Sequence, residues 1–218
     1  MEVEIWSDVV CPWCYLGKRR FDSALALFDH ADDVRITWRA FELDPNALKA
    51  SDVPLVELIA KKYGLTAQAV QESNSRITEL AAVEGLQYRL DLAKSANSFD
   101  AHRLIRLASD AGLADVAEER LFRSYFSEGG RISDRRELTD IAVEVGLDRS
   151  TVEEVFAGDA YVSEVRADEA LAMDLGISGV PFFAIDRRYG ISGAQDVETM
   201  VRALNAAWES TPSDRGVG

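Results

Sequence analysis

The amino-acid sequence predicts an α/β fold in which both ends of the chain contribute to one central sheet and the middle forms an all-helical insertion. Residues 2–38 follow the pattern strand, helix, strand, and residues 181–208 follow the pattern strand, strand, helix. Between them, residues 54–175 carry an almost unbroken helical pattern of about 120 residues. Because parallel strands need a crossover connection, we interpret this block as a crossover enlarged into a subdomain.

The N-terminal part of the predicted sheet domain, residues 1–53, begins with a short strand over residues 2–7. A helical pattern follows from Pro12 to about Phe28. Pro12 suits the first turn of this helix, where a backbone nitrogen has no partner within the helix. The alternating residues 34–38 then predict a second strand.

Polar residues ahead of apolar stripes predict where helices of the insertion begin. We expect Ser98 to cap a helix that contains Leu104, Asp115 to cap another, and residues 133–134 to begin a third that ends at Gly146. The apolar stripes of these helices should face a core.

The C-terminal part of the sheet domain, residues 176–210, carries two strands and a helix. The strands are expected over residues 181–186 and 189–191, with a turn at Arg187 and Arg188, and the helix runs to Trp208. We expect the polar tail, residues 211–218, to be frayed.

The charge and composition disfavour several classes of partner. The chain has 38 acidic and 24 basic residues, a formal net charge of −14, so nucleic acid and anionic membrane surfaces should be repelled. The sequence begins with an acidic strand rather than a basic, apolar signal peptide, and no apolar run reaches the length of a membrane span. These features favour the cytoplasm.

The two cysteines of the chain, Cys11 and Cys14, lie three positions apart. A disulfide between them would enclose almost no chain, so it would contribute little as a structural staple. Their position at the start of a helix favours chemistry, because the helix dipole and unpaired amides lower the pKa of a thiol at that place. Cys11 is then the nucleophile. Cys14, one turn further into the helix, is the resolving and less exposed cysteine.

A metal site is the alternative interpretation of this pair. Structural zinc sites use four ligands, commonly two cysteine pairs or one pair with two closely spaced histidines. This chain has a single pair, and its two histidines, His30 and His102, are far apart in sequence. We therefore expect no bound metal.

Three motifs together resemble the DsbA-like thioredoxin family, and most closely its FrnE-type branch. They are DVVCPWCYLG at residues 8–17, NSFDAHR at residues 97–103 and GISGVPFF at residues 176–183, within a resemblance that runs from residue 2 to about residue 209. The resemblance implies a thioredoxin-like fold with a helical insertion and a dithiol–disulfide site at Cys11 and Cys14.

The resemblance also implies a cis Val180–Pro181 bond that faces the cysteines, although the general frequency of such bonds is only about 5–6%. The Val180 backbone would then pair with an extended segment of the substrate. Pro12 and Trp13 shape the site from within the motif. Members such as DsbA have histidine at the position of Trp13, so the tryptophan, which has no positive charge, should stabilise a Cys11 thiolate less.

Further residues have both a structural and a functional interpretation. By analogy with related glutathione-dependent isomerases and transferases, Asn97 and Ser98 would contact a small substrate. By analogy with the FrnE-type branch, His102 would face the cleft. The amides around Gln195 and Asp196 could hold a carboxylate such as that of glutathione. The structural alternatives are helix caps at Ser98 and Asp196 and a solvated histidine.

Two acids near the motif, Asp8 and Glu42, could relay a proton to Cys14. The alternative is that both are ordinary acids of a turn and a strand end.

The predicted function is thiol–disulfide oxidoreduction, with disulfide isomerisation as an extension, on protein or low-molecular-weight thiols and disulfides. No dissociable cofactor is needed, because the electrons reside on the two sulfurs, and glutathione is a candidate co-substrate. Two alternatives use the same fold: a glutathione-dependent cis–trans isomerase or transferase of small aromatic acids, and a non-catalytic chaperone that binds peptides. The sequence leaves the oligomeric state open.

Overall fold

The central sheet has four strands, contributed by both ends of the chain. In the computed structural model, which describes residues 1–49, 51 and 53–210, β1 (Glu2–Ser7) pairs in parallel with β2 (Arg35–Ala40). β1 also pairs antiparallel with β3 (Phe182–Ile185), which pairs antiparallel with β4 (Tyr189–Ser192), giving the order β2-β1-β3-β4. This mixed sheet confirms the predicted thioredoxin-like fold. The predicted frayed tail lies outside the described residues.

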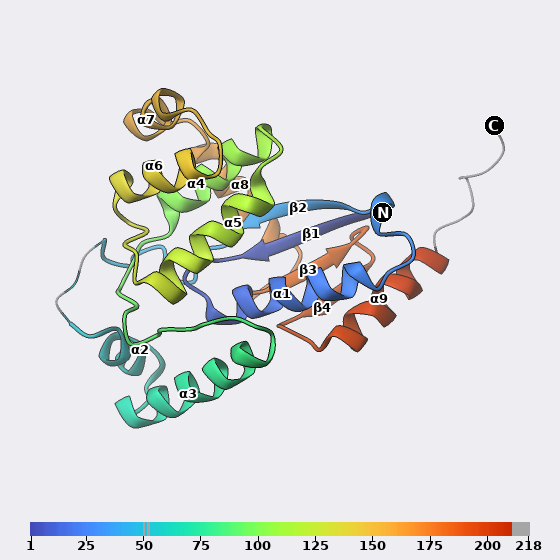
Figure 1. The fold of residues 1–218 in the computed structure, drawn as a ribbon, viewed down its shortest axis with the longest axis horizontal. Coiled ribbons are helices and arrows are strands. Elements are labelled where there is room, and N and C mark those ends of the chain that lie inside the picture. The colour runs from blue at the N-terminus through green and yellow to red at the C-terminus, as the bar shows by residue number, and fades with distance from the viewer. Residues whose placement is uncertain (50, 52, 211–218) are drawn as a thin grey trace.

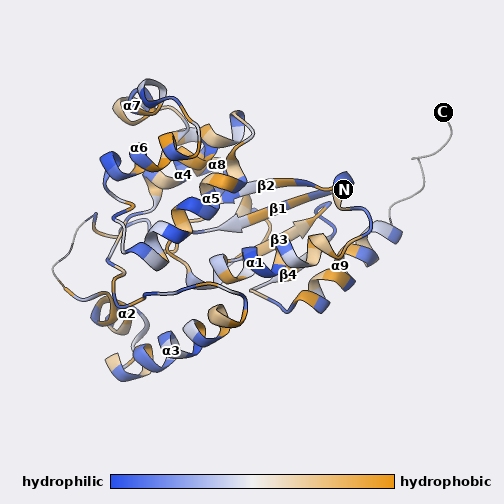
Figure 2. Cartoon of the chain, viewed as in Figure 1, coloured by the Kyte–Doolittle hydropathy of each residue, from blue (hydrophilic) through white to orange (hydrophobic). Residues whose placement is uncertain are grey.

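Helices cover both faces of the sheet (Figure 1). On one face, α1 (Pro12–Ala26) and α9 (Val197–Glu209) lie side by side over a core that includes Ile5, Phe21 and Phe183. On the other face, α8 (Val162–Asp174) packs against Trp6. Figure 2 shows the apolar strands between helices whose outer faces are polar, the alternation that burial of one helix face produces.

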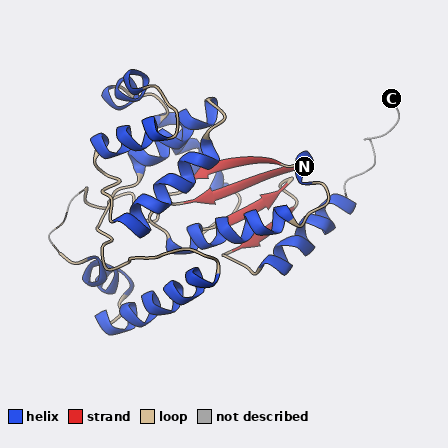
Figure 3. Cartoon of the chain, in the orientation of Figure 1, coloured by secondary structure: helices blue, strands red, loops and turns tan. Residues whose placement is uncertain are grey.

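The insertion is mainly helical, as Figure 3 shows. A short 3₁₀ turn, η1 (Ala31–Asp33), precedes β2. After β2 the chain forms α2 (Leu55–Tyr63), α3 (Ala67–Val83), α4 (Phe99–Asp110), α5 (Ala114–Arg123), the π-helical turn η2 (Ser124–Glu128), α6 (Arg135–Glu144) and α7 (Arg149–Ala157). Among the described residues, no helix combines the length and the apolar character needed to cross a bilayer.

One part of the predicted helical block is not helical: residues 84–98 form an irregular segment between α3 and α4. Gly85, in the left-handed region at φ +77°, turns the chain out of α3. The segment then buries Leu86 and Tyr88, and the amide of Arg89 donates a hydrogen bond to the carbonyl of Phe126 at 2.6 Å. Packing against the rest of the insertion thus overrides the local helical preference.

The predicted caps have mixed outcomes. Asp134 caps α6 as predicted, by accepting a hydrogen bond from the amide of Arg136. The predicted capping role of Ser98 is wrong, because its buried side chain caps no helix amide; Asn97 instead accepts from the amide of Phe99 at 3.2 Å. The predicted cap at Asp115 is also wrong: α5 begins at Ala114, so Asp115 lies inside the helix and Leu113 takes the cap position.

Candidate active site

The two cysteines stand at the start of α1. Cys11 is the residue before the helix, with extended backbone angles, and Pro12 occupies the first helical position. Both cysteines are free thiols, and 4% of Cys11 and 2% of Cys14 are exposed. The thiol of Cys11 donates a hydrogen bond to the carbonyl oxygen of Val180, with 3.6 Å between sulfur and oxygen. The first turn of α1 therefore faces the loop before β3.

The loop before β3 contains a cis bond between Val180 and Pro181, as the resemblance implied. Pro181 is buried, and its carbonyl accepts a hydrogen bond from the amide of Gly193 at 2.8 Å. The helix can approach this loop because residue 17 is glycine: a Cβ there would lie 2.8 Å from Cγ of Pro181. Gly17 thus belongs to the geometry of the site, which the motif did not show.

The environment of Cys14 differs from that of a surface thiol. Burial raises its pKa well above the usual value, and the neighbouring Cys11 thiol raises it further. The neighbouring Asp8 backbone and Ser7 hydroxyl act in the opposite direction and lower this pKa. Cys14 is therefore a protonated thiol in the reduced protein, and it must lose this proton before it can act as a nucleophile.

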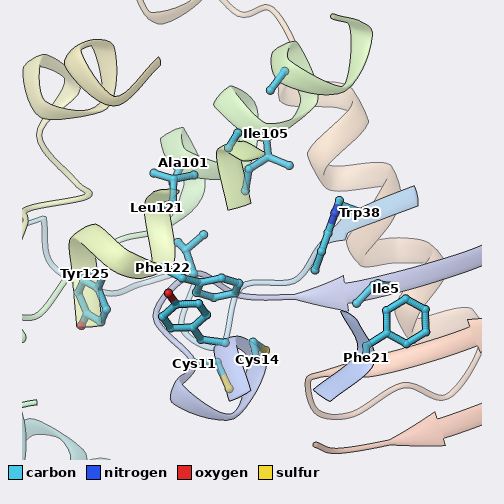
Figure 4. Packing of buried hydrophobic residues seen from close by; sticks show 14 of the residues in the cluster. Ile5, Cys11, Cys14, Phe21, Trp38, Ala101, Ile105, Leu121, Phe122 and Tyr125 are labelled. Atoms are coloured by element: carbon cyan, nitrogen blue, oxygen red, sulfur yellow. The ribbon is translucent and has the colours of Figure 1, made fainter. Parts of the chain in front are cut away.

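An aromatic cluster joins the insertion to the first turn of α1. The ring of Tyr15 stacks on Phe122 at 5.0 Å and on Tyr88 at 5.8 Å between centroids, and Tyr88 stacks on Phe126 at 5.2 Å. The Tyr88 hydroxyl donates to the carbonyl of Pro12 at 2.6 Å. Figure 4 shows the two cysteines close to Phe122 within the same hydrophobic cluster. Sequence reasoning missed Tyr88, because it lies in the irregular segment that was taken for helix.

The surface beside Cys11 is hollowed. A cavity of about 50 Å³ is bounded by Val10 and Pro12 on one side and by α2, Leu90 and Phe126 on the other. A wider hollow of about 480 Å³ continues from it between α3 and residues 88–91. Trp13, which follows Pro12 in the sequence, is 39% exposed. The two residues that flank Cys11 in sequence thus form part of the wall of the smaller hollow.

Behind the cysteines lies a cluster of three buried ionisable side chains. Asp8 is 0% exposed, His102 is 2% exposed and Glu118 is 1% exposed. The Asp8 carboxylate accepts hydrogen bonds from the amides of Leu43 at 2.7 Å and Val10 at 3.3 Å, and it lies 3.6 Å from Nε2 of His102. The hydrogen bond to Val10 is typical of an acid in a turn, but an ordinary turn acid is exposed, whereas the Asp8 carboxylate is completely buried.

The ionisation of this cluster follows from its burial. Desolvation lowers the pKa of His102, yet the nearby Asp8 carboxylate, 3.6 Å from Nε2, opposes this effect and the pKa is raised overall. Burial raises the pKa of Glu118 to about 8, so this carboxyl holds its proton at neutral pH. The prediction that His102 faces the cleft is wrong: its ring is buried against Asp8.

The other predicted site residues have structural roles. Asp196 caps α9 by accepting from the amide of Thr199 at 2.7 Å, and the exposed Gln195 donates to the carbonyl of Ser192. Asn97 donates from its side-chain amide to the carbonyl of Pro45 at 3.3 Å. None of these contacts joins the residues to Cys11.

Glu42 is buried and pairs with Arg166 of α8 at 2.5 Å. Burial raises its pKa above the usual value, so it is not an ordinary exposed strand-end acid. Within residues 1–49, 51 and 53–210, no group of three or more His, Cys, Asp or Glu side chains could hold a metal ion.

A free dithiol at the start of α1, facing a cis-proline loop that leads into the central strand β3 of a mixed sheet, defines a dithiol protein of the thioredoxin fold. The comparison with family models places it more narrowly. Residues 2–205 match the DSBA-like thioredoxin domain, and the chain belongs to this family.

Known structures and proteins agree with that assignment. The chain is similar to a probable DsbA oxidoreductase from Streptomyces coelicolor, with 42% identity and a TM-score of 0.93 over 100% of this chain and 94% of that one. It is 26% identical to the protein YwbO of Bacillus subtilis (strain 168), over 94% of this chain and 96% of that protein.

More distant structures share the fold. A 2-hydroxychromene-2-carboxylate isomerase is 17% identical, with a TM-score of 0.72 over 96% of this chain and 97% of that one. The cytosolic disulfide reductase DsbM of Pseudomonas aeruginosa, also solved with glutathione, is 16% identical, with a TM-score of 0.68 over 96% of this chain and 99% of that one.

Proposed function

We propose that the protein is a dithiol–disulfide oxidoreductase that acts on protein or low-molecular-weight disulfides, with Cys11 as the nucleophile and Cys14 as the resolving cysteine. The observation that carries the proposal is the geometry of the pair. The thiol of Cys11 faces the Val180 carbonyl of the cis-proline loop, and its sequence neighbours Val10 and Pro12 line a hollow. Cys14 is fully buried, and its raised pKa keeps its thiol protonated. Membership of the DSBA-like family supports it.

The reduction of a disulfide proceeds in two exchanges. The thiolate of Cys11 attacks one sulfur of the substrate disulfide, the substrate's S–S bond breaks, and one substrate thiol leaves with a proton. Cys14 then loses its proton and attacks the sulfur of Cys11, so that the mixed disulfide breaks and the second substrate thiol leaves. Two electrons have passed to the substrate, and Cys11 and Cys14 are left joined as a disulfide.

A thiol pool regenerates the pair by the same exchanges in reverse, so the proposal needs no dissociable cofactor. Glutathione is the proposed small thiol, as the related DsbM has been solved with it, and the cytoplasm is the proposed compartment, as for that protein. Disulfide isomerisation is the same first exchange followed by return of the substrate thiol before Cys14 attacks.

The test is exchange with glutathione disulfide and with a disulfide-bonded protein such as insulin. Cys11→Ser should abolish reaction with both, whereas Cys14→Ser should stop after one exchange and accumulate a mixed disulfide on Cys11. Undiminished exchange by Cys11→Ser would overturn the proposal. The reduction potential of the pair, followed by the emission of Trp13, then sets the direction of electron flow on a scale from about −270 mV for thioredoxin to about −120 mV for DsbA.

A glutathione-dependent isomerase of small aromatic acids is the second candidate, favoured by the small apolar hollow beside Cys11. It predicts that glutathione binds and an aromatic acid is isomerised while no disulfide is consumed. The presence of Cys14 counts against it, because a second cysteine at this spacing serves disulfide exchange and has no part in an isomerisation that uses the thiol of glutathione. Conversion of an aromatic acid by Cys14→Ser, with no exchange by the native protein, would favour it over oxidoreduction.

A further inference from the structure

The buried cluster of Asp8, His102 and Glu118 has no part in the exchange chemistry as described so far. Burying ionisable groups is costly unless they are paired, and an imidazole between two carboxyl groups is an arrangement that a structural core does not require. The members come from three separate places: the turn between β1 and α1, helix α4 and helix α5. The cluster therefore connects the helical insertion to the residues next to Cys14.

Asp8 is the centre of this connection. Its carbonyl accepts a hydrogen bond from the amide of Cys11 at 2.9 Å, and its backbone lies near enough to the sulfur of Cys14 to lower the pKa of that thiol. Its carboxylate binds the amides of Val10 and Leu43 and faces His102. A residue that contacts both cysteines through its backbone is thus held, through its side chain, by the insertion.

The charge on His102 sets the net charge of the buried Asp8–His102 pair. A buried carboxylate close to a thiol disfavours the thiolate, because two negative charges in a poorly solvated site repel each other. A protonated imidazole next to that carboxylate compensates its charge. Nε2 of His102 has no hydrogen-bond partner within bonding distance in the described structure, and the nearest acceptor is the Asp8 carboxylate at 3.6 Å.

We propose that His102 is a positioning residue for the resolving step: as an imidazolium beside Asp8, it supports the thiolate of Cys14 from the side opposite the substrate. The inference rests on the proposed function, since it concerns the second exchange of that reaction. The proton of Cys14 leaves to solvent, and His102 keeps its own throughout. The sulfur bonds that form and break are those of the two exchanges already given.

The groups that face His102 are compatible with this role. The carboxyl of Glu118 is neutral at neutral pH, so it adds no second negative charge to the cluster. Glu42 is paired with Arg166, and Lys18 forms ion pairs with Asp22 and Asp115. The ionisable groups around His102 and Glu118 come from four parts of the chain. They are Asp8 in the turn after β1, Glu42 after β2, Lys18 and Cys14 in α1, and Asp115 and Glu118 in α5.

The test separates the two exchanges with an aromatic disulfide, 5,5′-dithiobis(2-nitrobenzoate). The attack of Cys11 releases one coloured thiolate, and the attack of Cys14 on the mixed disulfide releases the second, so stopped-flow absorbance resolves both rates in one experiment. The variant is His102→Gln, which keeps a polar side chain and removes the charge. The matched control is His30→Gln, because His30 stacks on Trp208 beyond the far end of α1.

We expect His102→Gln to slow the second release about tenfold at pH 6–7, the effect of raising a thiol pKa by one unit. The first release should change much less. As the pH rises and His102 of the native protein loses its charge, the two proteins should converge. A purely structural defect would slow the second release at every pH. Equal second-phase rates and pH profiles in the native protein, His102→Gln and His30→Gln would overturn the inference.

The outcomes remain distinguishable if the proposed function is wrong or the variant does not fold. Absence of a second release in the native protein would contradict oxidoreduction itself. If His102→Gln does not fold, NMR titration of His30→Gln gives the pKa of the one remaining histidine. In this protein the logarithm of the second-phase rate should rise with pH below the pKa of His102 and flatten above it. A straight rise through that pKa would overturn the inference.

Discussion

Replacement of Gly17 by alanine tests the packing that brings α1 against the cis-proline loop. An added Cβ would lie 2.8 Å from Cγ of Pro181 and 3.5 Å from both Cβ of Ala194 and Cζ of Phe183. The first distance is about 1 Å shorter than an ordinary carbon–carbon contact. Because Pro181 and Phe183 are buried and the closest contact is a proline ring, the helix and the loop must move apart.

The expected free-energy change combines two effects of opposite sign. Overpacking by one methyl group costs about 1–3 kcal/mol. Alanine in a helix interior is favoured over glycine by about 0.5–1 kcal/mol. We therefore expect Gly17→Ala to lower the free energy of unfolding by about 1 kcal/mol, within a range of about 0–2.5 kcal/mol. The attack of Cys11 should also slow, since the Val180 carbonyl that its thiol contacts belongs to the displaced loop.

The matched control is Gly179→Ala, two residues before Pro181. No atom lies within 4 Å of a Cβ placed there, and the backbone is not in the left-handed region. This variant should be neutral or stabilised by about 0.4–1 kcal/mol, because alanine restricts the unfolded chain. Urea denaturation of both variants gives the comparison. If Gly17→Ala proved as stable as Gly179→Ala, the close contact between α1 and the loop would not exist as described.

Three further predictions concern buried charges and the second thiol. Arg103 is buried among backbone carbonyls of residues 155–160, and Arg103→Met should lower the free energy of unfolding by about 3–5 kcal/mol. Arg202→Gln, at an exposed ion pair, should change it by less than about 0.5 kcal/mol. Similar losses in the two variants would contradict this prediction. Folding raises the pKa of Glu118 from 4.5 to about 8, so the native protein loses stability as the pH rises between these values. Glu118→Gln lacks this loss, and its stability relative to the native protein should increase by up to about 1.4 kcal/mol per pH unit. A pH-independent difference between the two proteins in urea denaturation would contradict the burial of a protonated carboxyl. Cys14 of the reduced protein should react with iodoacetamide much more slowly than the other cysteine at pH 8, as peptide mass spectrometry would show, and equal labelling would contradict its raised pKa.

The sequence predicted those elements of the fold whose residues show a clear local periodicity. The strand over residues 2–7 and the helix that begins at Pro12 were predicted because the periodicity changes from two to helical at the cysteine motif. The irregular segment 84–98 was missed for the complementary reason. Its apolar residues are compatible with a helix, and only the stacking of Tyr88 between Tyr15 and Phe126, far away in sequence, makes the extended path favourable.

The candidate site shows the same division. The cysteines and Pro181 were identified from short motifs whose chemistry is local. His102 was misplaced because the sequence shows that it lies on a helix but not whether that side of the helix meets solvent or Asp8. Glu118 was not singled out at all, since one acid among 38 gives no sign of burial. Only the meeting of α4, α5 and the β1–α1 turn makes these residues a cluster.

The insertion is therefore a component of the redox site as well as a cover for it. It contributes Phe122 and Tyr88, which pack against the first turn of α1, and burial is the main cause of the raised pKa of Cys14. The same insertion contributes His102, whose positive charge acts against this effect by compensating Asp8. Burial alone would protect the resolving thiol and also slow it; a compensating charge from the same subdomain allows the thiol to be shielded from solvent and still react once Cys11 holds a substrate.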